Sequence, residues 1–428
     1  KYQKDCMQRY GDIYTFKIIG VPPFVVIGSP VAIKEILSKS ADNYDIGRGC
    51  SVGKPLVGDN SLFVYDGKRH QRERQLLMPP FHGKSIQSYA KSICDITAQL
   101  TSHWQENKRI VLRRTMQNIS LEVIIQIVFG LKEGERYKQI KPLLIQMSDT
   151  IDVPLNSSFL FLNFLRKDWG FKTPWVQMKN SREKIFDLLQ EEIDERRSQS
   201  DIIGNDILSL MMSATDEAGQ KLTDIELKDE LMTLLFAGHE TTASMMSWAI
   251  YEIIKHPHAL QKLREELDNK AKNLSPLEIA KLPYLNAVFK EALRMYPVLD
   301  LNLPRITKKP MKIMGYEFEA ETWLTISTYL VHHREDLYPV PYIFKPDRFL
   351  ERTFSRYEYL PFGGGTRRCL GYALAELEMK LVLAHIISKY ELSLVNQQQI
   401  QAQRRGLSIS PANGIPLVVK ERQVALKS

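Results

Sequence analysis

The sequence predicts a mainly α-helical protein with a minor β-sheet region, and three observations support this fold class. Apolar residues recur at helical spacing over most of the chain up to Tyr296. The segments that read as strands are short and lie near the two ends of the sequence. Neither a linker nor an internal repeat divides the 428 residues, so we expect one domain over residues 1–428.

The first third of the chain begins with strand-like runs at 13–19 and 24–28. Ser29 followed by Pro30 is typical of a helix start, and this helix is expected to reach about Ser40. The Gly-rich segment 42–62 is expected to be an irregular binding loop. Helices are then predicted at 66–77, 84–104, 115–129, 139–150 and 174–199. The aromatic, Leu-rich segment 152–171 is a candidate lipophilic lid.

The longest predicted helix spans 223–255, with Thr223 as N-cap and Glu226 as its capping-box partner. Its middle, 234–246, has few charges, so we expect both faces to be buried. Further helices are predicted up to 272, at 284–296 and at 371–389, with a capped turn at 275–278. Strands are predicted at 312–314, 317–318, 323–327, 407–410 and 415–419, the last two joined by a Pro-Ala-Asn-Gly turn.

Charge and cysteine usage exclude several function classes. The net charge of +8 is spread over interleaved acids and bases, which does not indicate nucleic-acid binding. Four cysteines without a CxxC pair argue against a zinc site or a disulfide framework and suit a reducing cytosol. No apolar run approaches the ~18 residues that a membrane span needs. Because the first residue is Lys1, we expect a truncated N-terminus, and whether an N-terminal membrane anchor precedes it stays open.

The stretch from Phe362 to Gly371 carries Cys369 on a glycine-rich loop, directly before a predicted helix. Glycines such as Gly363 let the backbone approach a flat ligand closely. The helix N-terminus and the neighbouring arginines favour thiolate over thiol, and a thiolate is an iron ligand. A buried free cysteine on a tight turn is the simpler interpretation, but it leaves the surrounding Phe, Gly and Arg unexplained.

Two helical patterns accompany this loop. A glycine and two threonine hydroxyls lie inside the long helix, in the run Ala237-Gly238-His239-Glu240-Thr241-Thr242. They predict a weakened helical segment with a groove, in which an acid lies beside a hydroxyl. Glu291 and Arg294 lie on one helical face, and Arg348 is a candidate bidentate third partner. A helix-packing glycine and an ordinary Glu-x-x-Arg spacing are the simpler alternatives.

The sequence also contains candidate anion-binding cations and two enzyme motifs that are incomplete or out of context. His70 and Arg74 are i,i+4 neighbours that can grip one carboxylate, and Arg305 and Arg367 are further candidates for anionic groups. His239-Glu240 begins a zinc-protease motif, but Ala243 stands where the second histidine is required. Gly49-Cys50-Ser51-Val52-Gly53 matches a nucleophile elbow without its strand and helix context, so a serine hydrolase on Ser51 is a distant alternative.

Together these residues resemble the cytochrome P450 family over essentially the whole chain. The cysteine-loop pattern of that family, Phe-x-x-Gly-x-Arg-x-Cys-x-Gly, is filled by Phe362, Gly365, Arg367, Cys369 and Gly371. Its other three motifs, the helical Glu-x-x-Arg, the Pro-x-Arg-Phe element and the oxygen groove, match Glu291 and Arg294, Pro346 to Phe349, and Ala237 to Thr242. The ensemble looks like a cyanobacterial member related to fatty-acid and terpenoid hydroxylases. Asp300 departs from the family, where many relatives have a second proline.

The resemblance implies haem b between the long helix and the cysteine loop, with Cys369 as the iron ligand. Cytochromes P450 are the standard example of a thiolate ligand that pushes electron density toward haem iron and favours O–O cleavage. The resemblance also implies that the propionates are held by His70, Arg74, Arg305 and Arg367, and that Phe362, Gly363 and Gly371 surround the cofactor. Thr241, with Glu240 behind it, would deliver protons to dioxygen, and Glu291, Arg294 and Arg348 would hold the loop in place.

The expected function is a haem-thiolate monooxygenase that inserts one oxygen atom from O2 into a lipophilic substrate such as a fatty acid or terpenoid. Alternatives are a peroxide-using or isomerising haem-thiolate enzyme and a non-catalytic haem sensor or carrier. Residues expected near the substrate are Phe236, Ala237, Leu299, Leu301 and Leu407, although ordinary core packing is an equal alternative for several of them.

No reductase module is fused to the chain, so electrons are expected from an acidic ferredoxin or flavodoxin. Its expected docking face comprises Lys84, Arg367, Arg368, Arg404 and Arg405. We expect a monomer in the cytoplasm, with peripheral membrane association as an open possibility.

Overall fold

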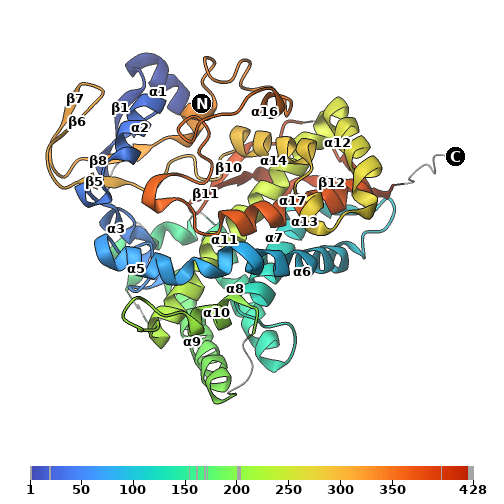
Figure 1. Ribbon diagram of the computed structural model, residues 1–428, viewed down its shortest axis with the longest axis horizontal. Coiled ribbons are helices and arrows are strands. Elements are labelled where there is room, and N and C mark those ends of the chain that lie inside the picture. Colours follow the sequence, from blue (N-terminus) through green and yellow to red (C-terminus); the bar gives the residue numbers. More distant parts are fainter. Residues whose placement is uncertain are drawn as a thin grey trace.

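The computed structural model describes residues 2–18, 21–153, 155–160, 162–167, 170, 172–199, 204–396 and 398–422. Helices make up most of the molecule, and small sheets lie on one side of it (Figure 1). The predicted fold class, mainly α with a minor β region, is therefore confirmed.

The helices agree with the sequence pattern to within a few residues at most ends. Those of eight residues or more are α1 (Tyr2–Tyr10), α2 (Pro30–Ser38), α5 (Gly67–Leu77), α6 (Gly83–Thr101), α7 (Leu112–Val123), α8 (Glu135–Asp152), α9 (Pro174–Ser198), α11 (Asp224–Lys255), α12 (Pro257–Lys270), α14 (Pro283–Met295) and α17 (Tyr372–Lys389). Shorter ones are α3 (Ile46–Gly49), α4 (Lys54–Val57), α10 (Ile207–Ser213), α13 (Pro276–Ile279), α15 (Thr328–His332) and α16 (Arg348–Glu351).

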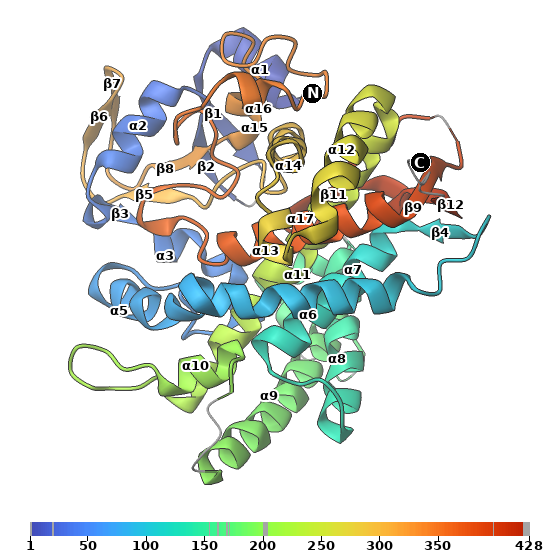
Figure 2. The same cartoon turned by 45° about the vertical axis from the view of Figure 1, so that its right-hand side comes forward.

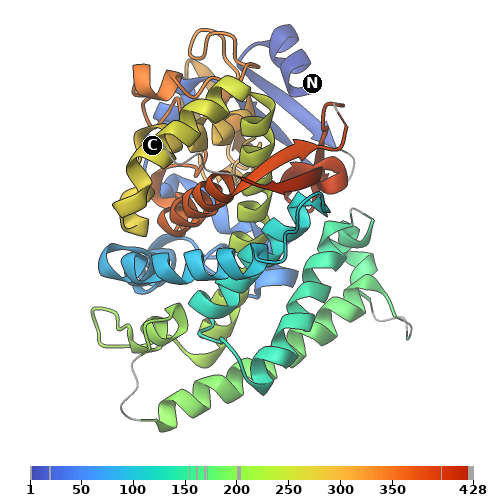
Figure 3. The ribbon, with the colours of Figure 1, turned by 90° about the vertical axis from the view of Figure 1, so that its right-hand side faces the viewer.

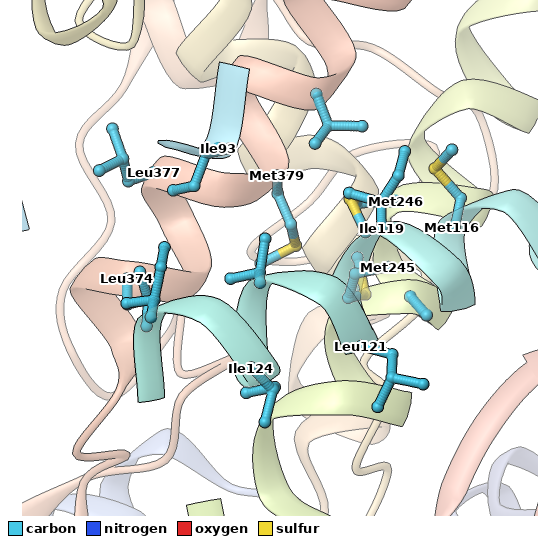
Figure 4. Close-up of a cluster of buried hydrophobic side chains, with 14 of the residues drawn as sticks. Ile93, Met116, Ile119, Leu121, Ile124, Met245, Met246, Leu374, Leu377 and Met379 are labelled. Carbon is cyan, nitrogen blue, oxygen red and sulfur yellow. The ribbon is translucent and has the colours of Figure 1, made fainter. Parts of the chain in front are cut away.

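Helix α11 passes through the middle of the molecule, behind α6 in Figure 2. Its N-terminus has the predicted capping box, in which Thr223 accepts from the Glu226 N–H and the Glu226 carboxylate accepts from the Thr223 N–H. Side chains of α6, α7, α11 and α17 meet in the main hydrophobic core (Figure 4). Residues 242–246 are buried, as their lack of charge predicts, but Ala237 is exposed, so the prediction that both faces of 234–246 are buried is wrong at this point.

The largest sheet has the strand order β1-β2-β8-β5-β3 and joins the N-terminal segment to the region after α14. Its strands are β1 (Ile13–Ile18), β2 (Val21–Ile27), β8 (Trp323–Ile326), β5 (Arg305–Thr307) and β3 (Tyr44–Asp45). Strands β2 and β8 pair in parallel, so residues about 300 positions apart become neighbours. The smaller sheets contain β4 (Arg109–Val111), β12 (Pro416–Glu421) and β9 (Tyr390–Leu394), β10 (Ala402–Arg405) and β11 (Ser408–Pro411), and β6 (Met311–Ile313) and β7 (Tyr316–Phe318).

The predicted strands 407–410 and 415–419 are present as β11 and β12, joined by the predicted turn. They belong to different sheets, because β11 pairs with β10 whereas β12 lies between β4 and β9. The positive φ of Asn413 and Ile415 turns the chain from one sheet to the other. One prediction about the irregular parts is wrong: segment 42–62 is not an irregular loop, since it contains β3, α3 and α4 and buries much of its apolar surface.

The structure also contains elements that the sequence pattern did not predict, among them α10, β5, β9 and β10. The candidate lid 152–171 contains two short turns, Asn156–Leu160 and Asn163–Arg166; Pro154, Phe161, Asp168, Trp169 and Phe171 lie outside the described residues. Figure 3 shows α8 and α9 on the side of the molecule away from the N-terminal strands. Within the described ranges, no helix combines the length and the apolar character that crossing a membrane requires.

Candidate active site

The cysteine loop runs from Phe362 to Gly371 and leads directly into α17. It is closed by a hydrogen bond from the Cys369 N–H to the Phe362 carbonyl at 3.0 Å. A Cβ on Gly364 would lie 2.6 Å from Leu37 Cδ1, so the side chain of Leu37 on α2 packs closely against the loop backbone and would have to shift for any larger residue. The glycine-rich sequence thus serves both the turn and this close approach to α2, whereas the predicted approach to a flat ligand stays a prediction.

Cys369 is solvent-accessible, although protein atoms crowd around its thiol. Desolvation by these atoms raises the pKa of the thiol. The Gly371 N–H, which bonds the sulfur, and the charges of Arg74 and Arg368 lower it in turn. An accessible sulfur beside an N–H group and two arginines fits a thiolate that binds a metal ion.

The predicted Glu–Arg–Arg cluster is formed and fully buried. Arg294 donates to both carboxylate oxygens of Glu291, at 2.7 and 2.9 Å, and Arg348 donates to Glu291 Oε1 at 3.1 Å. Arg294 also donates to the His332 carbonyl at 2.8 Å, and the Leu360 N–H donates to His332 Nε2 at 3.1 Å. Buried ion pairs need such additional bonds to offset desolvation. His332 thereby connects the cluster to the chain just before Phe362.

Two arginines near the loop have no anionic partner in the described part of the chain. Arg305 is 6% exposed, and its one hydrogen bond goes to the Leu303 carbonyl at 3.3 Å. Burial lowers the pKa of its guanidinium to about 10, with Arg367 acting in the same direction. Arg74 on α5 forms no ion pair with the described residues, and desolvation lowers its pKa. Buried unpaired charges are costly, so these two positions fit an anionic ligand.

His70 lies one turn before Arg74 on α5 and is buried. Desolvation, with smaller contributions from Arg367 and Arg74, lowers its pKa to about 3, so the imidazole is neutral at pH 7. Arg367 differs from the other cations, because it pairs with Asp66 at 2.6 Å and donates to the Leu62 and Tyr65 carbonyls. Its charge is therefore already compensated by the segment before α5.

The middle of α11 has an accessible strip on a helix that is otherwise buried there. Ala237 is exposed and Thr241 is half-buried, whereas Leu235 and Ala243 are fully buried. Thr241 Oγ1 donates to the Ala237 carbonyl at 2.5 Å. This is the predicted competition of a threonine hydroxyl with the backbone N–H groups for a helix carbonyl. The helix nevertheless continues without interruption through this segment. A Cβ on Gly238 would lie 3.0 Å from Ile124 Cδ1, so this glycine also packs against the end of α7.

Glu240 is held in a polar network next to Thr241. Its Oε1 accepts from Arg113 Nη2 at 2.6 Å and from Ser244 Oγ at 3.0 Å, and its Oε2 accepts from Gln117 Nε2 at 3.1 Å. Arg113 and Gln117 also donate to Asp152 at the end of α8, at 2.7 and 3.2 Å. The acid of the predicted groove is therefore an ion-paired carboxylate.

The predicted substrate-side residues come from segments that the fold brings together. Ile409 N–H donates to the Val298 carbonyl at 2.8 Å, which joins β11 to the segment after α14. Leu299 is 36% exposed and Leu407 is 45% exposed. Leu301 forms an isolated bridge with Ser327. Strand β11 also packs against α11, where Phe236 is half-buried.

Several functional residues carried no sequence signal of their own. His332, Arg113, Asp66 and Leu37 are single residues that pair with a motif over a distance of many positions. The unpaired arginines and the accessible cysteine form a donor set that fits haem, with a thiolate for iron and guanidinium groups for two propionates. When bound, haem supplies the activation of dioxygen.

The fold and this donor set define a haem-thiolate protein. Comparison with known proteins then shows the family: the family model described as Cytochrome P450 matches residues 1–417, so the chain belongs to the cytochrome P450 family. The protein named "Putative cytochrome P450 135B1" of Mycobacterium tuberculosis is 32% identical over 419 residues, covering 97% of this chain and 86% of the relative. That named "Putative cytochrome P450 138" from the same species is 28% identical over 417 residues, covering 97% and 90%.

Among solved structures, a cyanobacterial protein described as retinoic acid bound CYP120A1 shares the fold with a TM-score of 0.83 and 24% identity, covering 98% of this chain and 94% of that one. The predicted family is confirmed. The protein is a cytochrome P450 monooxygenase that uses haem b and O2, a small-molecule substrate and a separate redox partner. The sensor alternative is therefore not supported.

Proposed function

We propose that this monooxygenase inserts one oxygen atom into a lipophilic substrate such as a fatty acid or a terpenoid. The observation that carries the proposal is the accessible strip at Ala237 in the middle of the otherwise buried α11. In the proposed pocket, Phe236, Leu299 and Leu407 add apolar surface to this strip, whereas Leu301 packs against the N-terminal cluster that contains Cys6 and Val26. An apolar lining with few polar groups selects lipophilic ligands. The retinoic acid bound to the cyanobacterial structure supports including retinoids among the candidates.

A spectral titration of the purified holoenzyme with fatty acids, terpenes, retinoids and steroids tests the substrate class. We expect at least one lipophilic compound to shift the haem spectrum and to yield a product heavier by one oxygen atom when electrons and O2 are supplied. A preference for small polar compounds over all lipophilic ones would contradict the proposal.

In the proposed mechanism, Thr241 holds the hydroxyl nearest the accessible strip and relays protons, while Glu240 replenishes them. The proximity of these adjacent residues to the strip supports the assignment, and the Arg113 pair holds the Glu240 carboxylate in place. The corresponding cofactor assignments are Cys369 as ligand and His70, Arg74, Arg305 and Arg367 around the propionates, of which Arg74 and Arg305 have the strongest support.

Replacing Thr241 with Ala discriminates dioxygen-dependent turnover from the peroxide-using or isomerising alternative. We expect about a tenfold or greater loss of product per electron, with peroxide released instead, since a positioned acid–base group contributes about 10²–10⁴-fold. Replacing Thr242, which is buried on the same helix, with Ala is the matched control. Equal product yield in the Thr241 variant would favour the peroxide-driven alternative.

We further propose that the electrons come from an acidic ferredoxin or flavodoxin that docks near the cysteine loop. Lys84 and Arg368 support this, because both are exposed and neither forms an ion pair with the described residues. Of the other residues expected on this face, Arg367 and Arg404 are paired with Asp66 and Asp300. Arg405 is half-buried on β10. The proposal therefore rests mainly on Lys84 and Arg368.

Reduction rates at increasing ionic strength test this docking face. Charge-reversing Lys84→Glu and Arg368→Glu variants should slow reduction and weaken its salt dependence, because complementary charge acts mostly on the association rate. Lys184→Glu, an exposed position on α9, is the control. Reduction that is insensitive to both salt and these variants would remove the idea.

We also propose that the protein is a monomeric cytoplasmic enzyme whose lid touches a membrane surface. Support comes from the exposed side chains of Val153, Leu155, Leu162 and Phe164, which are apolar and lie in or beside the short turns of the lid. Sedimentation of the protein alone and with anionic vesicles checks both statements. We expect a monomer that co-sediments with vesicles, and a Leu155→Asp, Phe164→Asp variant that does not.

A further inference from the structure

Asp300, the residue at which this chain departs from its family, is the centre of a polar cluster. Both of its carboxylate oxygens accept from Arg404 Nη2 on β10, at 2.7 and 2.9 Å. Its Oδ2 also accepts from Gln3 Nε2 on α1 at 2.8 Å. Gln3 in turn accepts from Ser327 Oγ at 2.6 Å. One carboxylate thus ties the segment after α14 to the β10–β11 hairpin and to the N-terminal helix.

This cluster lies between two parts of the proposed pocket. Leu299 and Leu301 flank Asp300 directly in sequence, and Leu407 lies in the turn of the hairpin that carries Arg404. The hairpin turn also reaches the end of α8, because a Cβ on Gly406 would lie 3.0 Å from Ile151 Cγ2. The position of this turn therefore decides how far Leu407 stands from the Leu299 segment and from α8.

Two contacts join this end of the hairpin to the segment after α14. Ile409 N–H bonds the Val298 carbonyl, and Arg404, which lies opposite Ile409 in the hairpin, bonds Asp300. Arg404 is 51% exposed but Asp300 only 15%, so the arginine side chain approaches a largely buried carboxylate from the solvent side. A pair of this kind contributes little to overall stability, but it adds a side-chain restraint next to the main-chain bond.

We propose that the Asp300–Arg404 pair is a positioning clamp that sets the width of the substrate pocket and thereby its selectivity for ligand length. The inference rests on the proposed pocket. With the pair intact, Leu299 and Leu407 are held at a fixed separation and fit an extended apolar chain. Without it, the hairpin turn moves relative to the Leu299 segment, and long ligands lose contacts that small ones never make.

The test compares two ligands that bind haem iron through the same imidazole nitrogen, namely imidazole and N-dodecylimidazole. Dissociation constants from spectral titration of the holoenzyme give the preference for the long chain. We expect Asp300→Asn and Arg404→Gln each to reduce this preference about tenfold, within the range that apolar pocket contacts supply. Imidazole affinity should stay unchanged, and the reversed pair Asp300→Arg with Arg404→Asp should restore most of the preference.

Arg422→Gln is the matched control, because Arg422 forms a two-bond pair with Asp268 at a distant site, at 2.9 and 2.5 Å. It should leave the preference unchanged. An unchanged preference in Asp300→Asn, together with a reduced one in Leu299→Ala and Leu407→Ala, overturns the clamp but leaves the pocket standing. If Asp300→Asn, Arg404→Gln, Leu299→Ala and Leu407→Ala all leave the preference for the long chain unchanged, both the proposed pocket and the clamp are overturned.

Discussion

The cysteine side and the proposed substrate side of this protein each contain an arginine–carboxylate cluster, but the two clusters differ in burial. On the cysteine side, Glu291 and Arg294 are 0% exposed and share hydrogen bonds with Arg348 and His332. On the substrate side, Asp300 pairs with an arginine that is half exposed. Each cluster joins segments that lie far apart in the sequence.

The difference shows how one fold combines fixed chemistry with adjustable selectivity. Removing one partner of a buried pair leaves an uncompensated charge and costs about 3–5 kcal/mol, whereas an exposed pair contributes about 0.2–1 kcal/mol. The buried cluster therefore cannot change without loss of the fold around Cys369. The exposed pair can change at little cost to stability, and in our proposal its position beside Leu299 and Leu407 makes selectivity the property that changes.

The largest effect is expected at the cysteine itself. Cys369→Ser should abolish turnover and the carbonyl absorbance band of thiolate-bound haem, because a serine hydroxyl does not replace the thiolate. The reduced carbonyl difference spectrum measures this directly. Cys94→Ser on α6, where the thiol is half-buried, should keep the band. A thiolate-type band in the Cys369 variant would refute the assignment of the ligand.

The two clusters can be compared by matched substitutions. Arg294→Gln should lower the free energy of unfolding by about 3–5 kcal/mol and reduce haem content, because Glu291 is left buried without its main partner. Arg404→Gln should cost about 0.2–1 kcal/mol. Denaturant unfolding followed by fluorescence and by haem absorbance measures both. Similar losses in the two variants would remove the contrast between the two sides.

Replacing Arg305 is expected to affect the stability of the haem-free protein and the affinity for haem in opposite directions. Arg305→Gln should leave the haem-free protein as stable as before or more stable, since it removes a buried charge that has no anionic partner among the described residues. Haem affinity should fall about ten- to hundredfold, as expected for a charge-assisted hydrogen bond of about 1.5–3 kcal/mol. Haem transfer to apomyoglobin measures the affinity. Arg367→Gln, which leaves Asp66 unpaired, should instead destabilise the haem-free protein.

The next prediction concerns how the stability of the protein depends on pH, through a buried acid on the helix that follows the cysteine loop. Burial raises the pKa of Glu378 on α17 to about 8, above its usual value near 4.5. Between these values the folded protein holds a proton that the unfolded chain has released, so stability falls as pH rises from 4.5 to 8. This group contributes a slope of about 1.4 kcal/mol per pH unit.

Glu378→Gln should remove that slope, so the variant gains stability over the parent progressively between pH 5 and pH 8. Thermal unfolding across this range measures the difference. Glu376→Gln, a half-buried position on the same helix, is the control. Parallel curves for Glu378→Gln and the parent would show that Glu378 titrates normally in the folded protein.

Much of the fold and of the cysteine side could be predicted from the sequence because the relevant signals are local. The caps at Ser29, Thr223 and Ser275 depend on residues within three positions, and the structure confirms them. The cysteine loop and the Glu-x-x-Arg pair are also short patterns. The proposal that the chain folds as one domain follows from the absence of a linker and awaits a test by limited proteolysis.

The sequence by itself determined the helical class, the family and the type of chemistry, since each depends on residue spacing along one segment. Only the tertiary structure decided that Arg305 and Arg74 lack a described anionic partner while Arg367 has one, that Glu240 is paired with Arg113, and that β11 pairs with β10. Asp300 illustrates the reason. Its departure from the family was visible in the sequence, but its partners lie about 100 and 300 residues away, and only folding brings them together.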